Sequence, residues 1–191
     1  ASVNFPDTLI IEDKYRFKAT PPFVPGGEFA GEVIELGPDV SSVSVGDRIV
    51  TVSAVGGFAE EAVLEADRLI PVPASISYEV AAASTMAYGT SYYALKQRAA
   101  LQPGETLLVL GAAGGVGLAA VELGRLMGAR VIAAASSDEK LELCREYGAD
   151  EVINYTREGL KERTKELSGG AGADVIYDPV GGDLFDQAIR C

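Results

Sequence analysis

A glycine-rich run, Leu107-Leu-Val-Leu-Gly-Ala-Ala-Gly-Gly-Val-Gly117, is the segment whose residue types and spacing point most clearly to chemistry. With Ala112, Gly114 and Gly117 at the three signature positions it reads A-x-G-x-x-G, so alanine replaces the first glycine of the dinucleotide fingerprint. Gly114 and Gly115 would let the backbone approach a pyrophosphate, and Gly117 would let a helix pack against the preceding strand. The free amides at the start of that helix would receive the phosphate charge. A tight strand-to-helix turn without a ligand is the alternative.

The residues after the next predicted strand indicate which nucleotide the turn would serve. An NAD site usually has Asp or Glu at this strand end, about 20 residues after the motif, where it binds the ribose hydroxyls. Here Ala135 occupies that place and is followed by Ser136-Ser-Asp-Glu-Lys140. The hydroxyls of Ser136 and Ser137 and the ammonium of Lys140 would accept a 2′-phosphate, which predicts NADP. Alternatively, Ser137 only caps the following helix and Lys140 lies in solvent.

Strands and helices must alternate around these residues to bring them together. Alternation of this kind predicts a doubly wound parallel sheet, since each helix returns the chain to the same end of the next strand. The predicted strands are 106–110, 131–135, 152–154 and 174–178, and the predicted helices are 115–127, 138–147 and 157–167.

The first part of the chain has a different sequence pattern, with many turn residues between short apolar runs. Short strands separated by frequent turns predict a β-rich barrel or sandwich over residues 1–85, followed by a second domain over 86–191. The predicted strands here are 32–36, 48–52 and 59–64, and helices are expected at 77–84, capped by Ser75 or Ser77, and at 89–100.

The composition excludes several classes of protein and of site. The chain has no histidine, which excludes a Ser-His-Asp triad, a Cys-His dyad and a histidine-ligated metal. Its net charge of −12 disfavours a general nucleic-acid binder. No apolar run is long enough to span a membrane. Two cysteines do not suggest a disulfide framework, so we expect a reducing, cytoplasmic location.

Five segments together resemble a known family. They occur in order along nearly the whole chain: Asn4-Phe-Pro-Asp7, Pro25-Gly-Gly-Glu-Phe-Ala-Gly31, Val45-Gly-Asp-Arg-Ile49, Tyr88-Gly-Thr-Ser91 and Gly111-Ala-Ala-Gly-Gly-Val-Gly117. The set is similar to the zinc-independent NADPH:quinone oxidoreductase branch of the medium-chain dehydrogenase/reductase superfamily. The resemblance implies a GroES-like catalytic domain and a Rossmann domain, with NADPH in the cleft between them. Zinc-dependent relatives carry Gly-His-Glu at the place of Gly27-Glu28, together with cysteines that this chain lacks.

The resemblance also implies roles for individual residues. Asn4 and Tyr15 would line the nicotinamide and substrate pocket, and Thr90 would lie near the nicotinamide amide. The pyrophosphate and the 2′-phosphate would be held by two further groups: Gly114, Gly115, Val116 and Gly117 for the first, and Ser136, Ser137, Lys140 and Tyr155 for the second. Alternatively, Tyr15 only packs against a β core and Tyr155 is a surface turn residue.

The activity that the resemblance implies is hydride transfer from NADPH to a quinone or an activated alkene. An enoyl-thioester reductase and an NADPH-binding protein with little turnover are the alternatives, and solvent is the expected proton donor. The chain begins without Met and ends in a predicted helix after the fourth strand of the parallel sheet. We therefore expect both domains to be incomplete here, within a longer protein that forms a homodimer.

Overall fold

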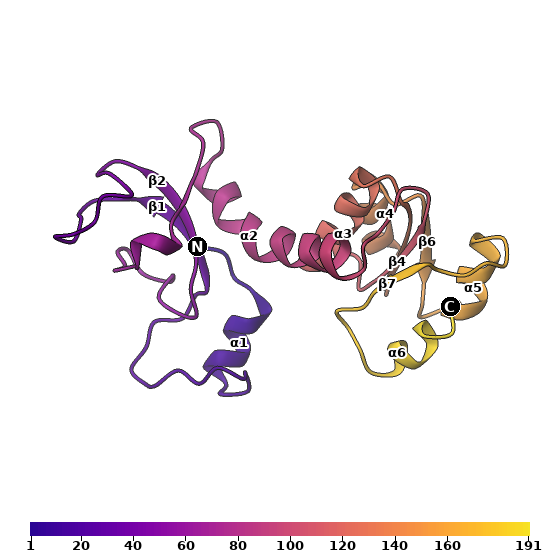
Figure 1. Cartoon of the computed structure of the whole chain (residues 1–191). Helices are drawn as coiled ribbons and strands as arrows, with labels where there is room; N and C mark the ends of the chain where they lie inside the picture. Colours follow the sequence, from indigo (N-terminus) through magenta and orange to yellow (C-terminus); the bar gives the residue numbers. More distant parts are fainter. The chain divides into compact units, whose positions relative to one another are not determined.

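The computed structural model describes residues 1–191, which fold into two compact units, Ala1–Met86 and Ala87–Cys191 (Figure 1). Helix α2 (Tyr78–Tyr92) runs across the boundary between them. Each unit has its own sheet, and each is described separately. No helix in the chain is both long and apolar enough to cross a lipid bilayer.

The second unit is built on a four-stranded parallel sheet. Its strands are β4 (Thr106–Leu110), β5 (Arg130–Ala135), β6 (Glu151–Asn154) and β7 (Val175–Tyr177). They lie in the order β6-β5-β4-β7, and every neighbouring pair is parallel. The predicted doubly wound sheet is therefore confirmed, with β4 and β5 at its centre.

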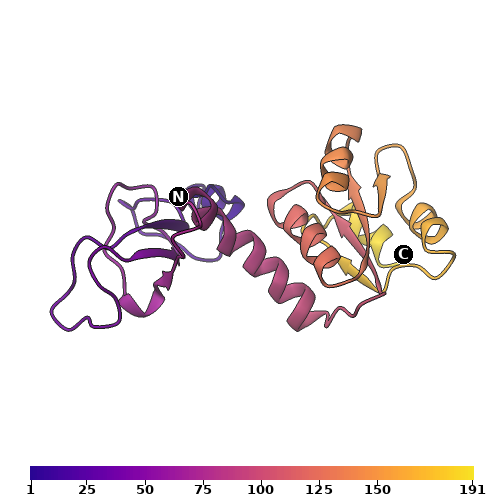
Figure 2. The same ribbon diagram turned by 90° about the horizontal axis from the view of Figure 1, so that it is seen from above.

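Helices cover both faces of this sheet, as Figure 2 shows. They are α3 (Gly115–Leu126), α4 (Asp138–Glu146), α5 (Leu160–Leu167) and α6 (Asp183–Ala188). Because strand side chains alternate between faces, Leu107 and Val109 pack with α3 and α4, whereas Leu108 and Leu110 pack with α5 and α6. Burial on both faces explains why β4 reads as an unbroken apolar run.

The first unit holds a small antiparallel sheet. Its strands β1 (Glu28–Glu32), β2 (Arg48–Val52) and β3 (Ile70–Pro71) lie in the order β1-β2-β3. Helix α1 (Phe5–Ile11) and a short 3-10 turn (Ala66–Arg68) complete the unit. The buried apolar residues of the unit include Ile10 of α1, Phe29 of β1, and Ile49 and Val50 of β2.

Two of the three strands predicted in the first unit were misplaced, because apolar alternation does not supply a hydrogen-bonding partner. The strand expected at 32–36 lies earlier, at Glu28–Glu32, since the chain opposite it turns away at Gly46, whose φ is +91°. Residues 59–64 form no strand and make no backbone hydrogen bonds. The strand at 48–52 is confirmed.

The helices predicted at 77–84 and 89–100 are one continuous helix. Helix α2 passes through Gly89 and continues as a π-helical segment, Tyr93–Arg98. A single glycine costs a helix only about 1 kcal/mol, so it need not end one. Ser77 is the cap, since its hydroxyl accepts the amide of Val80 at 3.3 Å. The helix predicted at 157–167 begins later, at Leu160.

Replacement of Leu108 by alanine tests the core of the second unit. Leu108 is fully buried in the α5 and α6 face of the sheet, so Leu108→Ala should lower the free energy of unfolding by about 2–5 kcal/mol in a urea titration. Leu126→Ala is the matched control, because Leu126 is 76% exposed and its loss should change little. Equal effects of the two substitutions would contradict this packing.

Candidate functional site

The glycine-rich run forms the turn between β4 and α3. Gly111 follows the strand with a φ of +56°, and the amide of the buried Ala112 donates to the carbonyl of Ala134 on β5 at 3.1 Å. The amide of Gly114 closes the turn on the carbonyl of Gly111 at 2.9 Å, and α3 begins at Gly115. The turn is therefore anchored to both central strands.

The first turn of α3 presents free backbone donors. The amides of Gly115, Val116 and Gly117 have no acceptor in the chain, and Gly114 at the helix cap has no side chain to supply one. Unsatisfied amides and the helix dipole together favour an anion at this end of a helix. The turn can therefore hold a phosphate group.

The glycines of this turn differ in what a side chain would meet. A Cβ on Gly117 would lie 2.3 Å from the carbonyl oxygen of Gly111 and 2.9 Å from the Cα of Ala112, so only glycine lets α3 pack this closely. A Cβ on Gly115 would meet no atom within 4 Å. Packing thus explains the glycine at 117, whereas Gly115 borders open space.

Helix α2 is pinned to this turn beside Thr90. The buried hydroxyl of Ser91 donates to the carbonyl of Val116 at 2.8 Å and lies 3.2 Å from the phenol oxygen of Tyr177 at the end of β7. Thr90 is exposed next to this anchor. Sequence reasoning missed Ser91, because a buried serine in a helix gives no pattern of its own.

Register brings the second group of predicted residues to the same edge of the sheet. Leu110 pairs with Ala134, and Ala135 pairs with Asn154, so β4, β5 and β6 end side by side. Ser136 and Ser137 follow β5, and the amide of Tyr155 after β6 donates to the carbonyl of Ala135 at 3.2 Å. Carboxyl ends of parallel strands are where ligands bind in such sheets.

The structure joins two of these side chains and gives a third a capping role. The Lys140 ammonium donates to the Ser136 hydroxyl at 3.1 Å. The Ser137 hydroxyl caps α4 by accepting the Lys140 amide at 3.4 Å. Lys140 is exposed, so its charge is available beside Ser136. The alternative in which Ser137 caps the helix is thus observed, and it is compatible with a role in phosphate binding.

Asp138 puts a carboxylate near these residues, but that carboxylate has its own partners. Its side chain accepts the Asn154 amide at 2.9 Å and pairs with the Arg157 guanidinium. These two hydrogen bonds, that from Asn154 first, lower the pKa of Asp138. Arg157 therefore offsets the charge of Asp138 locally.

In the first unit, Asn4 sits at the start of α1 as its N-cap. Its backbone amide donates to a carboxylate oxygen of the buried Asp7 at 2.8 Å, and its side-chain amide donates to Ser2 Oγ at 2.8 Å and to Glu28 Oε2 at 3.2 Å. Glu28 is fully buried. Tyr15 follows α1, is half-buried, and makes no side-chain hydrogen bond in the chain.

Sequence reasoning missed Glu28 and the role of Asp7. The signal for Asp7 was present, because Asn4 and Asp7 have the spacing of a helix cap and its third residue. Glu28 gave no such signal. Only the fold shows that this acidic residue in a strand is buried rather than exposed.

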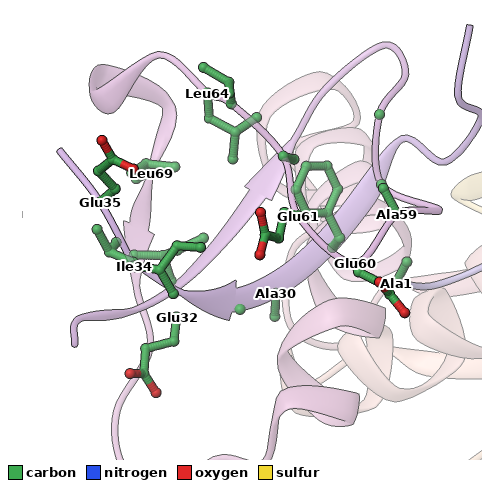
Figure 3. Close-up of a pocket in the computed structure, with 18 of the residues that line it drawn as sticks. Ala1, Ala30, Glu32, Ile34, Glu35, Ala59, Glu60, Glu61, Leu64 and Leu69 are labelled. Carbon is green, nitrogen blue, oxygen red and sulfur yellow. The ribbon is translucent and has the colours of Figure 1, made fainter. Parts of the chain in front are cut away.

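A hollow of about 850 Å³ lies elsewhere in the first unit, between residues 32–37 and 59–64 (Figure 3). Its wall carries the carboxylates of Glu32, Glu35, Glu60 and Glu61. None of the predicted site residues lines it. The residues of the glycine-rich turn are thus not part of this hollow.

No three Cys, Asp or Glu side chains of the chain are placed so that they could hold a metal ion together. Cys144 is buried among apolar residues, and this burial raises the pKa of its thiol to about 11. Cys144 is therefore a packing residue rather than a nucleophile.

Two different family models match the two parts of the chain. Residues 1–74 match the family model described as alcohol dehydrogenase GroES-like domain, and residues 115–191 match the model described as zinc-binding dehydrogenase. A quinone oxidoreductase-like protein 2 homolog from Nematostella vectensis is 49% identical over 191 residues, covering 99% of this chain and 52% of the relative.

Solved structures share the same architecture. Escherichia coli quinone oxidoreductase complexed with NADPH is 38% identical with a TM-score of 0.90, over 99% of this chain and 58% of that one. An NAD-dependent alcohol dehydrogenase is 30% identical with a TM-score of 0.93, over 100% of this chain and 63% of that one.

The chain spans about half the length of the curated relatives it matches. Within that span the order of motifs, the GroES-like and Rossmann-type architecture and the similarity in sequence agree. The chain belongs to the medium-chain dehydrogenase/reductase superfamily, in its quinone oxidoreductase branch.

Proposed function

We propose that the whole protein is an NADPH-dependent oxidoreductase that transfers hydride to a quinone or an activated alkene. The observation that carries the proposal is the turn at Gly114–Gly117, with its free amides and the open space at Gly115. Membership in the quinone oxidoreductase branch supports the reaction class.

The residues present fit a dinucleotide in two respects. The open position at Gly115 and the three unsatisfied amides suit a diphosphate. The hydroxyl of Ser136 and the ammonium of Lys140, which lie 3.1 Å apart, suit the further phosphate of NADPH. We propose Ser137 and Tyr155 as its remaining neighbours.

The side chains after β5 support NADPH over NADH. The fold alone does not select the nucleotide, since a protein with the same architecture is NAD-dependent by name. No carboxylate stands at position 135, where an NAD site would have one, and Asp138 is paired with Asn154 and Arg157. Lys140 therefore supplies a positive charge that Asp138 does not cancel directly.

NADPH would supply the hydride, so the protein has to orient the reactants and exclude water. We propose that Thr90, fixed by the neighbouring Ser91, contacts the nicotinamide. Asn4 and Tyr15 would contact the nicotinamide or the acceptor. Solvent would deliver the proton, because the chain places no histidine in the site and the Tyr15 phenol has no partner that would activate it. The whole protein would act as a homodimer.

An enoyl-thioester reductase would use the same nucleotide site with another acceptor, and a binding protein would use it without turnover. Neither alternative has a specific side chain in its favour.

The test of the proposed function is a titration with NADPH and NADH followed by an acceptor panel, both with the full-length protein. We expect tighter binding of NADPH and faster oxidation with 1,4-benzoquinone than with an enoyl thioester. Binding without oxidation by any acceptor would refute the enzyme.

Substitution of Gly115 tests whether the open space beside α3 receives the diphosphate. Gly115→Ala should fold normally, because its Cβ meets nothing within 4 Å, yet it should weaken NADPH binding roughly tenfold, the equivalent of about 1.4 kcal/mol. Gly31→Ala, at another open position on β1, is the control for both stability and binding. Unchanged NADPH affinity in Gly115→Ala, measured by calorimetry, would exclude this site.

Substitution of Lys140 tests the choice of nucleotide. Lys140→Ala should raise the Kd for NADPH roughly tenfold and leave that for NADH nearly unchanged, because only NADPH carries the extra phosphate. Lys161→Ala, on α5, removes the same charge elsewhere and should alter neither value. Equal losses for both nucleotides would place Lys140 outside the phosphate site.

A further inference from the structure

Glu28 is a fully buried carboxylate that none of the proposed roles uses. Its Oε1 accepts the backbone amide of Met86 at 2.6 Å, and its Oε2 accepts the Ser2 hydroxyl at 2.5 Å and the Asn4 side-chain amide at 3.2 Å. No ion pair reaches it. Burying a carboxylate that is stabilised only by neutral donors costs free energy, so the presence of Glu28 at this position needs an explanation.

The explanation lies in the direction of the Asn4 amide. An ionised carboxylate can only accept hydrogen bonds, so the atom of Asn4 that faces Glu28 must be the NH2 group. That nitrogen also donates to Ser2 Oγ at 2.8 Å, which uses both of its hydrogens. The carbonyl oxygen of the Asn4 side chain faces the backbone amide of Asp7 in the capping box of α1, and its second lone pair is left for a ligand.

A second buried carboxylate fixes the backbone of the same residue. Asp7 accepts the amide of Asn4 at 2.8 Å with one oxygen and the amide of Gly27 at 3.0 Å with the other. Glu28 follows Gly27 directly. The backbone and the side chain of Asn4 are thus each tied to the start of β1 by a carboxylate.

We propose that Glu28 is a positioning residue that fixes the polarity of Asn4, so that Asn4 offers its ligand a hydrogen-bond acceptor and not a donor. The ligand group it would take carries an N–H or O–H, such as a carboxamide or a hydroxyl. The inference rests on the proposed function only in assuming that Asn4 contacts the nicotinamide or the acceptor.

The substitution Glu28→Gln reverses this polarity with almost no change in volume. The amide of Met86 still requires an acceptor, so the new side chain must turn its oxygen to Met86 and its NH2 to Asn4. Two NH2 groups cannot face each other, so the Asn4 amide turns round and presents a donor. We expect kcat/KM with NADPH and a quinone to fall at least tenfold.

A second substitution can restore the polarity that Glu28→Gln reverses. Adding Asn4→Asp to Glu28→Gln puts a carboxylate at position 4 that accepts from the amide at position 28 and again leaves an acceptor for the ligand. The pair should recover kcat/KM to within about threefold of the original protein, whereas Asn4→Asp alone sets two carboxylates against each other and should stay impaired. No recovery in the pair would overturn the proposal.

A matched control separates positioning from stability. Thr51 is equally buried in β2, and its hydroxyl donates to the carbonyl of Arg68 at 3.1 Å. Thr51→Val removes a buried hydrogen bond of the first unit without touching Asn4, so it should lower the melting temperature and leave kcat/KM unchanged. If Thr51→Val lowers kcat/KM as much as Glu28→Gln does, the role of Glu28 is structural only.

A readout without catalysis keeps this inference separate from the proposed function. In ¹⁵N-labelled full-length protein, the Asn4 side-chain NH2, identified by its disappearance in Asn4→Ala, should exchange slowly with water. In Glu28→Gln it should exchange at least tenfold faster, because it has turned away from its buried partners. An unchanged resonance would refute the inference even in an active enzyme, and a changed one would support it even if no quinone were reduced.

Discussion

The close approach of helix α3 to the end of strand β4 is the constraint on which the second unit depends. It requires residue 117 to lack a side chain, since a Cβ there would lie 2.3 Å from the carbonyl oxygen of Gly111. The approach places the unsatisfied amides of α3 at the edge of the sheet where β4, β5 and β6 end together. A larger residue at 117 would move the whole first turn of the helix. Any anion-binding capacity at this edge therefore follows from backbone packing.

The fold of the second unit was predictable because its signals are local and repeated. Short strands and helices alternate along it with similar spacing, and each supports the assignment of the next. The first unit was harder, because apolar alternation marks an extended segment without naming its partner. Ile34–Leu36 and Ala59–Leu64 have the pattern of strands but no ladder. The sequence did not predict that α2 continues without a break, because the effect of Gly89 on the helix depends on the packing around it.

The candidate site divides in the same way. Glycine positions, the cap at Ser137 and the hydroxyl–ammonium pair after β5 can be found from sequence, because each depends on neighbours a few residues away. Ser91 and Glu28 depend on contacts across more than 20 residues, with Val116 and Met86, which no spacing rule supplies. The residues proposed to contact a ligand are thus easier to find from sequence than the residues that would orient them.

The orientation of neutral polar groups matters in a chain that has no histidine. An asparagine side chain can act as donor or acceptor, and nothing in its own structure selects one. A lysine or arginine beside Asn4 would also satisfy Glu28, but it would release the amide and leave its direction open. Only neutral groups donate to Glu28, so its carboxylate needs the NH2 of Asn4 as one of its donors. An ion pair at Glu28 would have removed that need. The burial of one carboxylate among neutral donors thereby gives a defined polarity to an uncharged group.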